Sequence, residues 1–515
     1  MTDVGTTGPP GSRGAIDKGL KAGAIGLTST VVIGVASTAP GYSLAASLGL
    51  VTDSAGAQAP AILWLAFVPM LFIAAAYFYL NRADPDCGTT FTWATRALGP
   101  VTGWMGGWVI IIADLVVMPS LADITGQYAF QLFGADGLAN DKYWRMAIGV
   151  VFILAMTWIC VIGIELNAKT QVGLLLAELT VLVIFAAVAL YKVYNGDLAG
   201  SVDPSLDWVN PFKISDASAL SGGLLAALFI YWGWDTAVTV NEECEDSKRT
   251  PGVAAIVSTF ILVGIYLVVG IAAQAIRGPG FLTAHSDDVL GAAGNLVLGS
   301  PFDKLLIIAV LTSAAASTQT TILPAARSEL SMAVHKALPG WFGHIDRKYL
   351  TPTNATWTFG IFASAFYAVL TILSDNVLAA SIGSVGLMIA LYYGLTGIVC
   401  PIYYRRHIFS SLKNFVFVGL APLIGGAVLF WTFAKATIDS FQKPGTAWFG
   451  IESSWVMGMI LLAIGIPIML WTASRDSSFF RRGIDPIDQR PDPDGNGPEP
   501  PPIVPGVDAS VLREA

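Results

Sequence analysis

Charge is scarce in this sequence of 515 residues. Only 12% of the residues are Asp, Glu, Lys or Arg, whereas about a quarter are charged in a typical soluble domain. Hydrophobic residues make up 54%, and the mean hydropathy is positive. This composition excludes an ordinary soluble protein and predicts an all-α polytopic membrane protein that has the lipid bilayer as its surroundings. The net charge of −8 argues against nucleic acid as a partner.

Cysteine and histidine are also rare, with four residues of each kind. The cysteines, Cys87, Cys160, Cys244 and Cys400, fall in predicted spans or inner loops, where disulfides do not persist, so we expect free thiols. The histidines lie in loops or at span ends without metal-ligand spacing, and we predict neither a metal site nor a cofactor. Their placement argues against an intramembrane enzyme, which would need a nucleophile and base or a metal cluster at membrane depth.

Long apolar segments account for most of the chain. Each approaches the roughly 20 residues that a spanning helix requires, and short polar joints separate them. The sequence predicts twelve spans, at residues 26–50, 60–81, 101–133, 146–164, 170–194, 218–243, 252–276, 303–335, 354–374, 377–404, 413–436 and 453–473. Between the second and third, residues 84–100 form an amphipathic piece that lies on the membrane surface or caps the bundle.

The basic residues are unevenly divided between the two sides of the predicted bundle. If both termini are cytoplasmic, 20 of the 28 Lys and Arg residues lie on the inner side, as the positive-inside rule favours. We therefore predict a multi-pass protein of the cell membrane with cytoplasmic termini. Residues 1–20 and 475–515 are Gly-rich and Pro/Asp-rich and are predicted to be disordered tails around a transmembrane transporter domain at 21–474. These patterns do not predict an oligomeric state.

The first predicted span is interrupted near its middle. The interrupted stretch consists of Ser37, Thr38, Ala39, Pro40, Gly41 and Tyr42. Pro40 has no backbone N–H and its ring collides with the carbonyl group of Ala36, while Gly41 adds backbone freedom, so the helical ladder weakens here. The stretch is either a simple proline kink or a true break, and a true break survives at this depth only where it is buried or lines a watery cavity.

A second interruption falls in the sixth span. It consists of Tyr231, Trp232, Gly233, Trp234 and Asp235, and a polar run follows it. Breaks in the first and sixth spans stand at matching places in two halves of five spans that face opposite ways across the membrane. Such a pattern is the best sequence indication of a transporter's substrate site. We therefore predict a five-plus-five inverted repeat with discontinuous helices 1 and 6.

The direction of the two broken spans assigns a chemistry to each break. The half-helix that begins at Gly41 points its N-terminus at the midplane, where free N–H groups and the positive end of the dipole suit a carboxylate. The half that ends near Tyr231 points carbonyl groups at the same region, which suits an ammonium group. Together they predict a receptor for a zwitterion. Asp235 is expected to act as an N-cap rather than as a direct ligand, and one of Tyr231, Trp232 and Trp234 is expected in the pocket.

Ionisable residues within spans are functional candidates by default. The acids in question are Asp114 and Asp123 in the third span, Glu178 in the fifth and Asp235 in the sixth. Asp114 and Asp123 project from opposite helix faces, so they cannot line one cavity, and each has a structural role as its alternative. Sodium coupling would need several oxygen ligands, some of which the eighth span offers as Ser313, Ser317, Thr318, Thr320 and Thr321. Helix packing is the alternative role of these hydroxyl groups.

Two local signatures make the chain resemble the amino acid, polyamine and organocation (APC) superfamily of permeases. The first is Gly88, Phe91, Trp93, Arg96, Leu98, Gly99, Gly103, Trp104, Gly107 and Trp108, with Thr89 in place of a second glycine. The second is Gly233-Trp234-Asp235 followed by Glu242-Glu243, Lys248-Arg249 and Pro251, with Ser247 where proline is common. Thr38-Ala39-Pro40-Gly41 departs from the glycine-serine-glycine turn of many amino acid permeases.

The resemblance implies the twelve-helix inverted-repeat fold and alternating access. Many similar permeases carry a lysine at the place of Glu178, where it is associated with replacing a coupling cation. Glu178 is therefore predicted to couple proton binding to transport, with a structural hydrogen-bonding role as its alternative and Asp114 as a second candidate for coupling. We predict a proton-coupled importer of amino acids or related amines, with sodium as the alternative ion. An exchanger of amines, polyamines or amino acids and a non-transporting sensor are the alternative functions, although a sensor normally adds a folded signalling domain.

Overall fold

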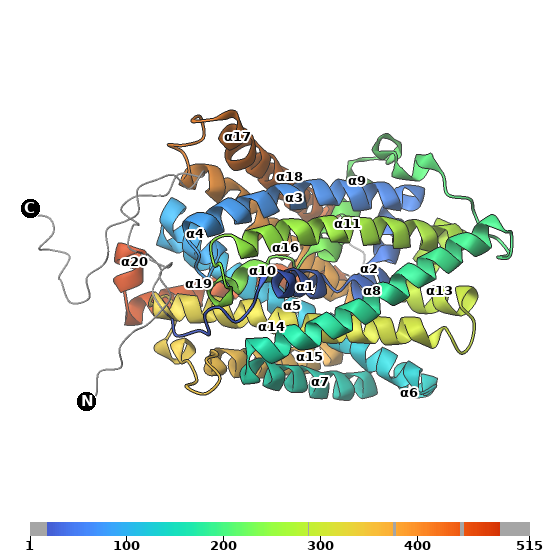
Figure 1. Ribbon diagram of the computed structural model, residues 1–515, viewed down its shortest axis with the longest axis horizontal. Helices are drawn as coiled ribbons and strands as arrows, with labels where there is room; N and C mark the ends of the chain where they lie inside the picture. Colours follow the sequence, from blue (N-terminus) through green and yellow to red (C-terminus); the bar gives the residue numbers. More distant parts are fainter. Residues whose placement is uncertain (1–17, 287, 374–376, 443–446, 485–515) are drawn as a thin grey trace, which may run out of the picture.

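The computed structural model describes residues 18–286, 288–373, 377–442 and 447–484. Its long helices run side by side along one axis, as Figure 1 shows. The spanning elements are α1 (Leu27–Thr38) with α2 (Pro40–Ala55), α3 (Ala59–Ala83), α5 (Pro100–Leu132), α7 (Lys142–Ile162), α8 (Ile164–Tyr194), α9 (Ala217–Tyr231) with α10 (Thr236–Thr239), α11 (Thr250–Arg277), α14 (Lys304–Val334), α15 (Thr353–Leu373), α16 (Val377–Tyr403), α18 (Ala421–Gln442) and α19 (Ser453–Arg475).

Shorter elements connect these spans. They are η1 (Gly56–Gln58), α4 (Thr90–Leu98), α6 (Asp136–Ala139), η2 (Leu206–Val209), η3 (Pro211–Lys213), η4 (Asn241–Glu243), α12 (Pro279–Ala284), α13 (Val289–Val297), η5 (Gly340–Gly343), α17 (Leu412–Asn414), the π-helical η6 (Phe415–Leu420) and α20 (Ser478–Arg482). Within the described residues the sheet content is one antiparallel pair of strands, β1 (Ala447–Trp448) and β2 (Ile451–Glu452).

Ten stretches of the described chain are long and apolar enough to cross a membrane. One of them, Leu27–Ala83, contains two spans, because α3 follows the broken pair α1–α2. The short apolar helix α9 and its continuation α10 form one further broken span. Counted in this way, the described part of the chain has the twelve predicted spans, and the protein is an all-helical membrane protein.

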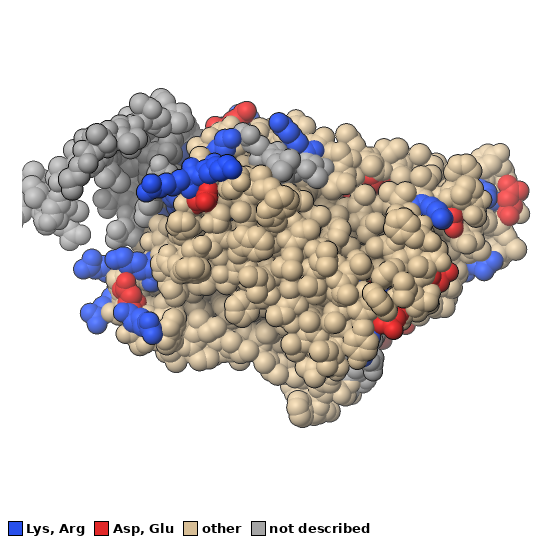
Figure 2. Space-filling view, turned by 90° about the horizontal axis from the view of Figure 1, so that it is seen from below, with Lys and Arg blue, Asp and Glu red and all other residues tan. Residues whose placement is uncertain are grey.

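Charged residues avoid the middle of the molecule. On the face drawn in Figure 2 they gather at the two ends of the long axis and leave an uncharged belt between them. Large apolar side chains project from the spans along the belt, for example Trp158 and Phe362, which are both exposed. This distribution fits a bundle whose middle faces lipid and whose ends face water. The end that holds Lys18 and α20 is called the terminal end below (Figure 1).

Helix α4 caps the bundle at the terminal end. Phe91 and Trp93 are fully buried, and the Trp93 indole Nε1 donates a hydrogen bond to the Asp84 carbonyl oxygen over 2.9 Å. Of the two placements predicted for residues 84–100, the structure has the cap rather than the membrane surface.

The described chain packs beyond the predicted domain limits of 21 and 474. Lys18 and Leu20 are buried, and the Phe479 ring of α20 stacks on Phe91 with 5.5 Å between ring centroids. The rest of the two predicted tails, residues 1–17 and 485–515, lies outside the described residues. All four cysteines are free and buried, in agreement with the predicted free thiols.

Candidate transport site

The first span is broken between Thr38 and Pro40. Ala39 adopts the left-handed conformation, with φ of 47° and ψ of 68°, and this residue turns the chain between α1 and α2. The second half-helix begins at Pro40, one residue earlier than predicted. Proline suits a first helical position because the N–H group that it lacks would have no partner within the helix. The interruption is therefore a true break and not a simple kink.

The sixth span is broken after Tyr231. Trp232 is extended, Gly233 has a φ of +118°, and the chain resumes as the single turn α10 and then as the 3₁₀ turn η4. The second half of this span is therefore much shorter than a helix that continues to residue 243. A glycine is required at 233 because other residues rarely adopt this φ.

The two breaks touch each other. A Cβ atom at Gly233 would lie 2.7 Å from the carbonyl carbon and oxygen of Ser37, so only glycine permits this approach. The hydroxyl groups of Ser37 and Thr236 are hydrogen-bonded at 2.8 Å. Helix α2 packs on α9, and α1 packs on α10, so the broken spans run side by side in opposite directions. This is the arrangement that the positions of the breaks predict.

Glu178 lies at the first break. Its Oε1 accepts a hydrogen bond from the Gly41 backbone N–H over 2.6 Å and another from the Ser313 hydroxyl over 2.8 Å. The Ser313 oxygen in turn accepts the Tyr42 backbone N–H over 3.1 Å. Glu178 is fully buried, and its Oε2 has no hydrogen-bond partner among the described residues. The structure thus places the predicted coupling acid on the N-terminus of α2.

The eighth span also binds the end of α1. The Ser317 hydroxyl donates to the Ser37 carbonyl oxygen over 3.0 Å, while Thr318 and Thr320 bond the backbone of their own helix. Ser313 and Ser317 therefore bridge α14 to the two sides of the first break. Of the five hydroxyl groups considered for sodium, those of Ser313, Ser317, Thr318 and Thr320 are hydrogen-bonded within the protein.

The C-terminal end of α9 holds the predicted aromatic residues. The Ile230 carbonyl oxygen accepts the Tyr266 hydroxyl over 2.6 Å, and the Tyr231 ring packs edge-on against Tyr266. The Tyr231 hydroxyl has no partner within the described part of the chain. Trp234 is fully buried in a cluster with Tyr77 and Tyr393, at ring distances of 5.2 and 5.1 Å.

The prediction that Asp235 caps the second half-helix is wrong. Asp235 stands at the N-cap position of α10, but its side chain makes no capping bond. Its carboxylate instead accepts the hydroxyl groups of Tyr392, over 3.0 Å, and Tyr393, over 2.8 Å. The Trp232 indole Nε1 donates to the Tyr392 hydroxyl, so this acid, α16 and the second break form one network. The adjacent Tyr392 and Tyr393 of the tenth span were the sequence feature that could have indicated this network.

Two further buried acids lie on α5 and α14. Asp114 on α5 interacts electrostatically with Asp235 and with Glu329 on α14. The Asp114 Oδ2 and Glu329 Oε2 atoms have no hydrogen-bond partner among the described residues. Glu329 was not among the predicted candidates because it lies near the end of its span. Asp123 is separate, since it contacts Arg145 at 3.3 Å and accepts the Tyr367 hydroxyl at 3.1 Å.

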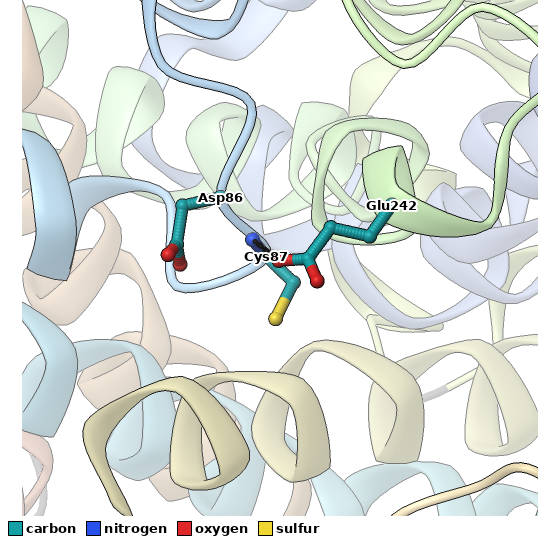
Figure 3. A group of neighbouring side chains, drawn as sticks. All are labelled: Asp86, Cys87 and Glu242. Atoms are coloured by element: carbon teal, nitrogen blue, oxygen red, sulfur yellow. Dashed lines mark hydrogen bonds between the residues drawn. The ribbon is translucent and has the colours of Figure 1, made fainter. Parts of the chain in front are cut away.

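A buried ion-pair cluster closes the terminal end over this region. The Lys18 ammonium contacts the Asp86 carboxylate at 2.8 Å and also pairs with Glu242. Figure 3 shows Asp86, Cys87 and Glu242 converging from the loop before α4 and from η4. One ligand atom from each of these three lies within 4.8 Å of the others, a spacing that a metal ion would also fit. Lys18 supplies the positive charge between the two carboxylates, and we assign no metal here.

The charges of this cluster reinforce one another. Burial lowers the pKa of Lys18, but the charges of Asp86, Cys87 and Glu242 and the hydrogen bond to Asp86 together outweigh this effect and hold the pKa well above its usual value. Burial likewise raises the pKa of Asp86, but Lys18 and the hydrogen bond from His335 hold it well below its usual range. Both groups are therefore charged at neutral pH.

The segment before α1 pairs with the end of the sixth span. The Glu243 carbonyl oxygen accepts the backbone N–H groups of Ala24 and Ile25, and the Glu245 N–H donates to the Ile25 carbonyl oxygen over 3.0 Å. The Glu243 carboxylate is held by the Arg327 guanidinium of α14 through two bonds of 3.0 Å. The terminal end thus joins the N-terminal segment, the sixth span and the eighth span.

Comparisons with known proteins agree with this geometry. The amino acid permease family profile matches residues 23–460. The low-affinity putrescine importer PlaP of Escherichia coli K12 is 22% identical over 445 residues, which cover 85% of this chain and 91% of PlaP. An arginine/ornithine antiporter of Latilactobacillus sakei is 23% identical over 322 residues, or 58% of this chain and 63% of the antiporter. The crystal structure of MhsT in complex with L-phenylalanine aligns with a TM-score of 0.58 and 15% identity, covering 78% of this chain and 98% of MhsT.

Because the family profile spans most of the sequence, the chain belongs to the amino acid permease family of the APC superfamily. It is a membrane transporter of the amino acid and polyamine class and not an enzyme. Its fold is that of MhsT. The resemblance inferred from the sequence and the predicted fold class are confirmed.

Proposed function

We propose that this permease imports amino acids or related amines across the cell membrane by alternating access and that proton binding at Glu178 couples the uptake to a pH gradient. The contact between the Glu178 carboxylate and the Gly41 N–H carries the proposal, because it joins an ionisable group directly to the start of the second half of a broken helix. Discontinuous helices that meet at the bilayer midplane form the substrate and ion sites of many secondary transporters.

Proton binding would weaken the hydrogen bonds by which Glu178 holds the start of α2. An ionised carboxylate accepts strong, charge-assisted hydrogen bonds, whereas a protonated one loses its charge and gains a donor. Glu178 holds both Gly41 and Ser313, so its protonation weakens the connection between α8, α14 and the start of α2. A proton can thereby bias the position of the half-helix beside the substrate. Asp114 is the second candidate for this role, since it is buried and only partly hydrogen-bonded.

The substrate class follows from the charge of the region. Asp114, Asp235 and Glu329 are buried, Asp235 lies at the second break, and none of the three forms an ion pair with a described Lys or Arg. Such a region favours a cationic ligand. Relatives named as a putrescine importer and as an arginine/ornithine antiporter support the same class. The antiporter also supports the second candidate function, exchange of one amine or amino acid for another.

Uptake into proteoliposomes tests the proposal. Labelled amino acids and amines are offered with an imposed pH gradient, with a sodium gradient, or with unlabelled substrate inside. We expect accumulation that depends on the pH gradient. Accumulation driven by sodium would replace the proton as the coupling ion, and uptake that requires internal substrate would establish exchange.

The substitution Glu178→Gln tests the coupling residue. Glutamine keeps an acceptor for Gly41 but cannot take up a proton, so we expect gradient-driven uptake to be abolished while substrate binding is retained. Binding is measured on the purified variant by ligand-induced thermal stabilisation. Unchanged gradient-driven uptake would refute the coupling role of Glu178.

A further inference from the structure

We propose that Glu178 is a resident carboxylate that occupies the anion site at the N-terminus of α2 and so restricts this permease to amines that lack a carboxylate. The inference rests on the proposed function of the two breaks and names the substrate class of that site. It differs from the zwitterion receptor that the broken spans alone predict.

No backbone N–H group in the first turn of α2 is free to bind a ligand. Pro40 has no N–H group, Gly41 donates to Glu178, and Tyr42 donates to Ser313. The Ser43 N–H donates to the Ala39 carbonyl oxygen over 2.8 Å. A carboxylate from a ligand would normally take these N–H groups at the positive end of the helix. Here the protein's own carboxylate takes that place.

When it is ionised, Glu178 would also repel the carboxylate of a ligand. Its side chain is fully buried, and its Oε1 bonds only uncharged groups, Gly41 and Ser313. Its Oε2 lacks a hydrogen-bond partner among the described residues and lies at the break because it shares a carbon with Oε1. Two carboxylates cannot both remain ionised at close range in a buried site. A ligand carboxylate would therefore have to displace or protonate Glu178.

The opposite side of the breaks offers acceptors for an ammonium group. Asp235 lies at the second break, and both Asp114 Oδ2 and Glu329 Oε2 are buried without a hydrogen-bond partner in the described structure. The carboxyl group of Asp235 at the second break and the unpartnered oxygen atoms of Asp114 and Glu329 can accept hydrogen bonds from an ammonium group. This polarity suits a monoamine or diamine and does not suit a zwitterion.

Matched pairs of ligands that differ by one carboxylate test the inference. The pairs are agmatine with arginine, cadaverine with lysine, and putrescine with ornithine. Each ligand is offered to the wild-type permease in proteoliposomes and, separately, to the purified protein in a thermal-stabilisation assay. We expect the amine of at least one pair to bind about tenfold or more tightly than its amino acid, as loss of charge-assisted bonds implies.

Two variants distinguish occupancy from charge. Glu178→Ala frees the Gly41 N–H and the Ser313 hydroxyl, so the ratio of amino acid to amine affinity should rise by about tenfold. Glu178→Gln still occupies Gly41 and should change the ratio less. Thr180→Ala is the matched control, because Thr180 lies on α8 like Glu178, is exposed and bonds only the backbone of its own helix, so this variant should leave the ratio as in the wild type.

The outcomes separate this inference from the proposed function. Equal binding within the pairs, or tighter binding of the amino acids, would overturn the resident-carboxylate role while leaving transport intact. A Glu178→Ala protein that folds and binds an amine but gains no amino acid affinity would overturn it as well. Absence of both binding and uptake for every pair would instead refute the proposed function.

Discussion

At the scale of single residues, the site depends on a backbone contact that leaves no room for a side chain. Gly233 brings the backbone of the sixth span against Ser37, and Ala39 turns the first span without a glycine. A non-glycine residue in the left-handed region costs about 1 kcal/mol or more, so Ala39 holds strain at the break. Strain of this kind is common at sites that switch between conformations.

Gly233→Ala should disrupt the contact between the breaks. The added methyl group would lie 2.7 Å from the Ser37 carbonyl, and alanine disfavours a φ of +118°, so we expect a loss of about 2 kcal/mol or more of stability and loss of substrate binding. Thermal unfolding in detergent and ligand-induced stabilisation measure the two effects.

Gly264→Ala is the matched control for this substitution. Gly264 lies within α11, and a Cβ atom there would meet nothing within 4 Å. Alanine favours a helix over glycine by about 1 kcal/mol, so this variant should be as stable as the wild type or more stable. If Gly233→Ala were as stable and active as Gly264→Ala, the contact between the breaks would not matter.

At the scale of elements, sequence patterns located the breaks but not what surrounds them. Pro40 and Gly41 weaken a helix locally, and the run around Gly233 does the same, so both interruptions could be predicted. The partners of Asp235 could not, because Tyr392 and Tyr393 lie on α16, more than 150 positions along the chain, where only tertiary packing brings them together. The N-cap role was predicted from local rules, and the tertiary partners replaced it.

The contacts of Glu178 could not be predicted from the sequence either. Its depth in a span marked it as a functional candidate, and the lysine that similar permeases carry at this place suggested proton coupling. Its hydrogen bond to Gly41 requires knowledge of how α8 packs on the first span, which a single sequence does not supply. Lys18 was missed for a related reason, since it precedes the first span and its partners lie in loops far along the chain.

Lys18→Ala should open the terminal end locally. Without its ammonium group, Asp86 and Glu242 would be two buried carboxylates facing each other, and breaking a buried pair typically costs about 3–5 kcal/mol. Cys87 is a natural reporter, because it is buried between them and its N–H donates to Glu242 over 2.9 Å. We expect maleimide labelling of Cys87 to accelerate by about tenfold or more.

Two variants serve as controls for this labelling. Lys248→Ala removes an exposed lysine from the loop after the sixth span and should leave the labelling rate unchanged. Cys87→Ser in the Lys18→Ala background should remove the additional label and so identify the modified thiol. Equal labelling of the wild type and the Lys18→Ala protein would show that the ion pair does not keep this end closed.

The Lys18–Asp86 ion pair at the terminal end should be insensitive to pH across the neutral range. The folded-state pKa of Asp86 is lowered, so its contribution is present above the usual carboxyl pKa near 3.8 and is lost only as the pH falls through the lowered value. The pKa of Lys18 is raised, so its contribution is complete below about 10.5 and is lost only as the pH rises through the raised value. Any pH dependence of transport near neutrality should therefore originate outside the Lys18–Asp86 pair.

At the scale of the whole molecule, the uneven distribution of basic residues predicts the orientation. The terminal end receives 20 of the 28 Lys and Arg residues in the predicted topology, so both termini are expected in the cytoplasm. A reporter that fluoresces only in the cytoplasm, fused to either terminus, should be active at both. An active reporter at one terminus alone would require an odd number of spans, and inactivity at both would reverse the bundle.

The strand-like pairing of Ala24 and Ile25 with Glu243 and Glu245 has a consequence for how the two halves of the molecule depend on each other. The single turn α10 is too short to finish its side of the sixth span, and residues that precede the first helix complete that wall. The second half of the molecule thus depends on backbone supplied by the segment that precedes the first span. We therefore expect the second half, expressed without the first, to lose the folded end of its sixth span.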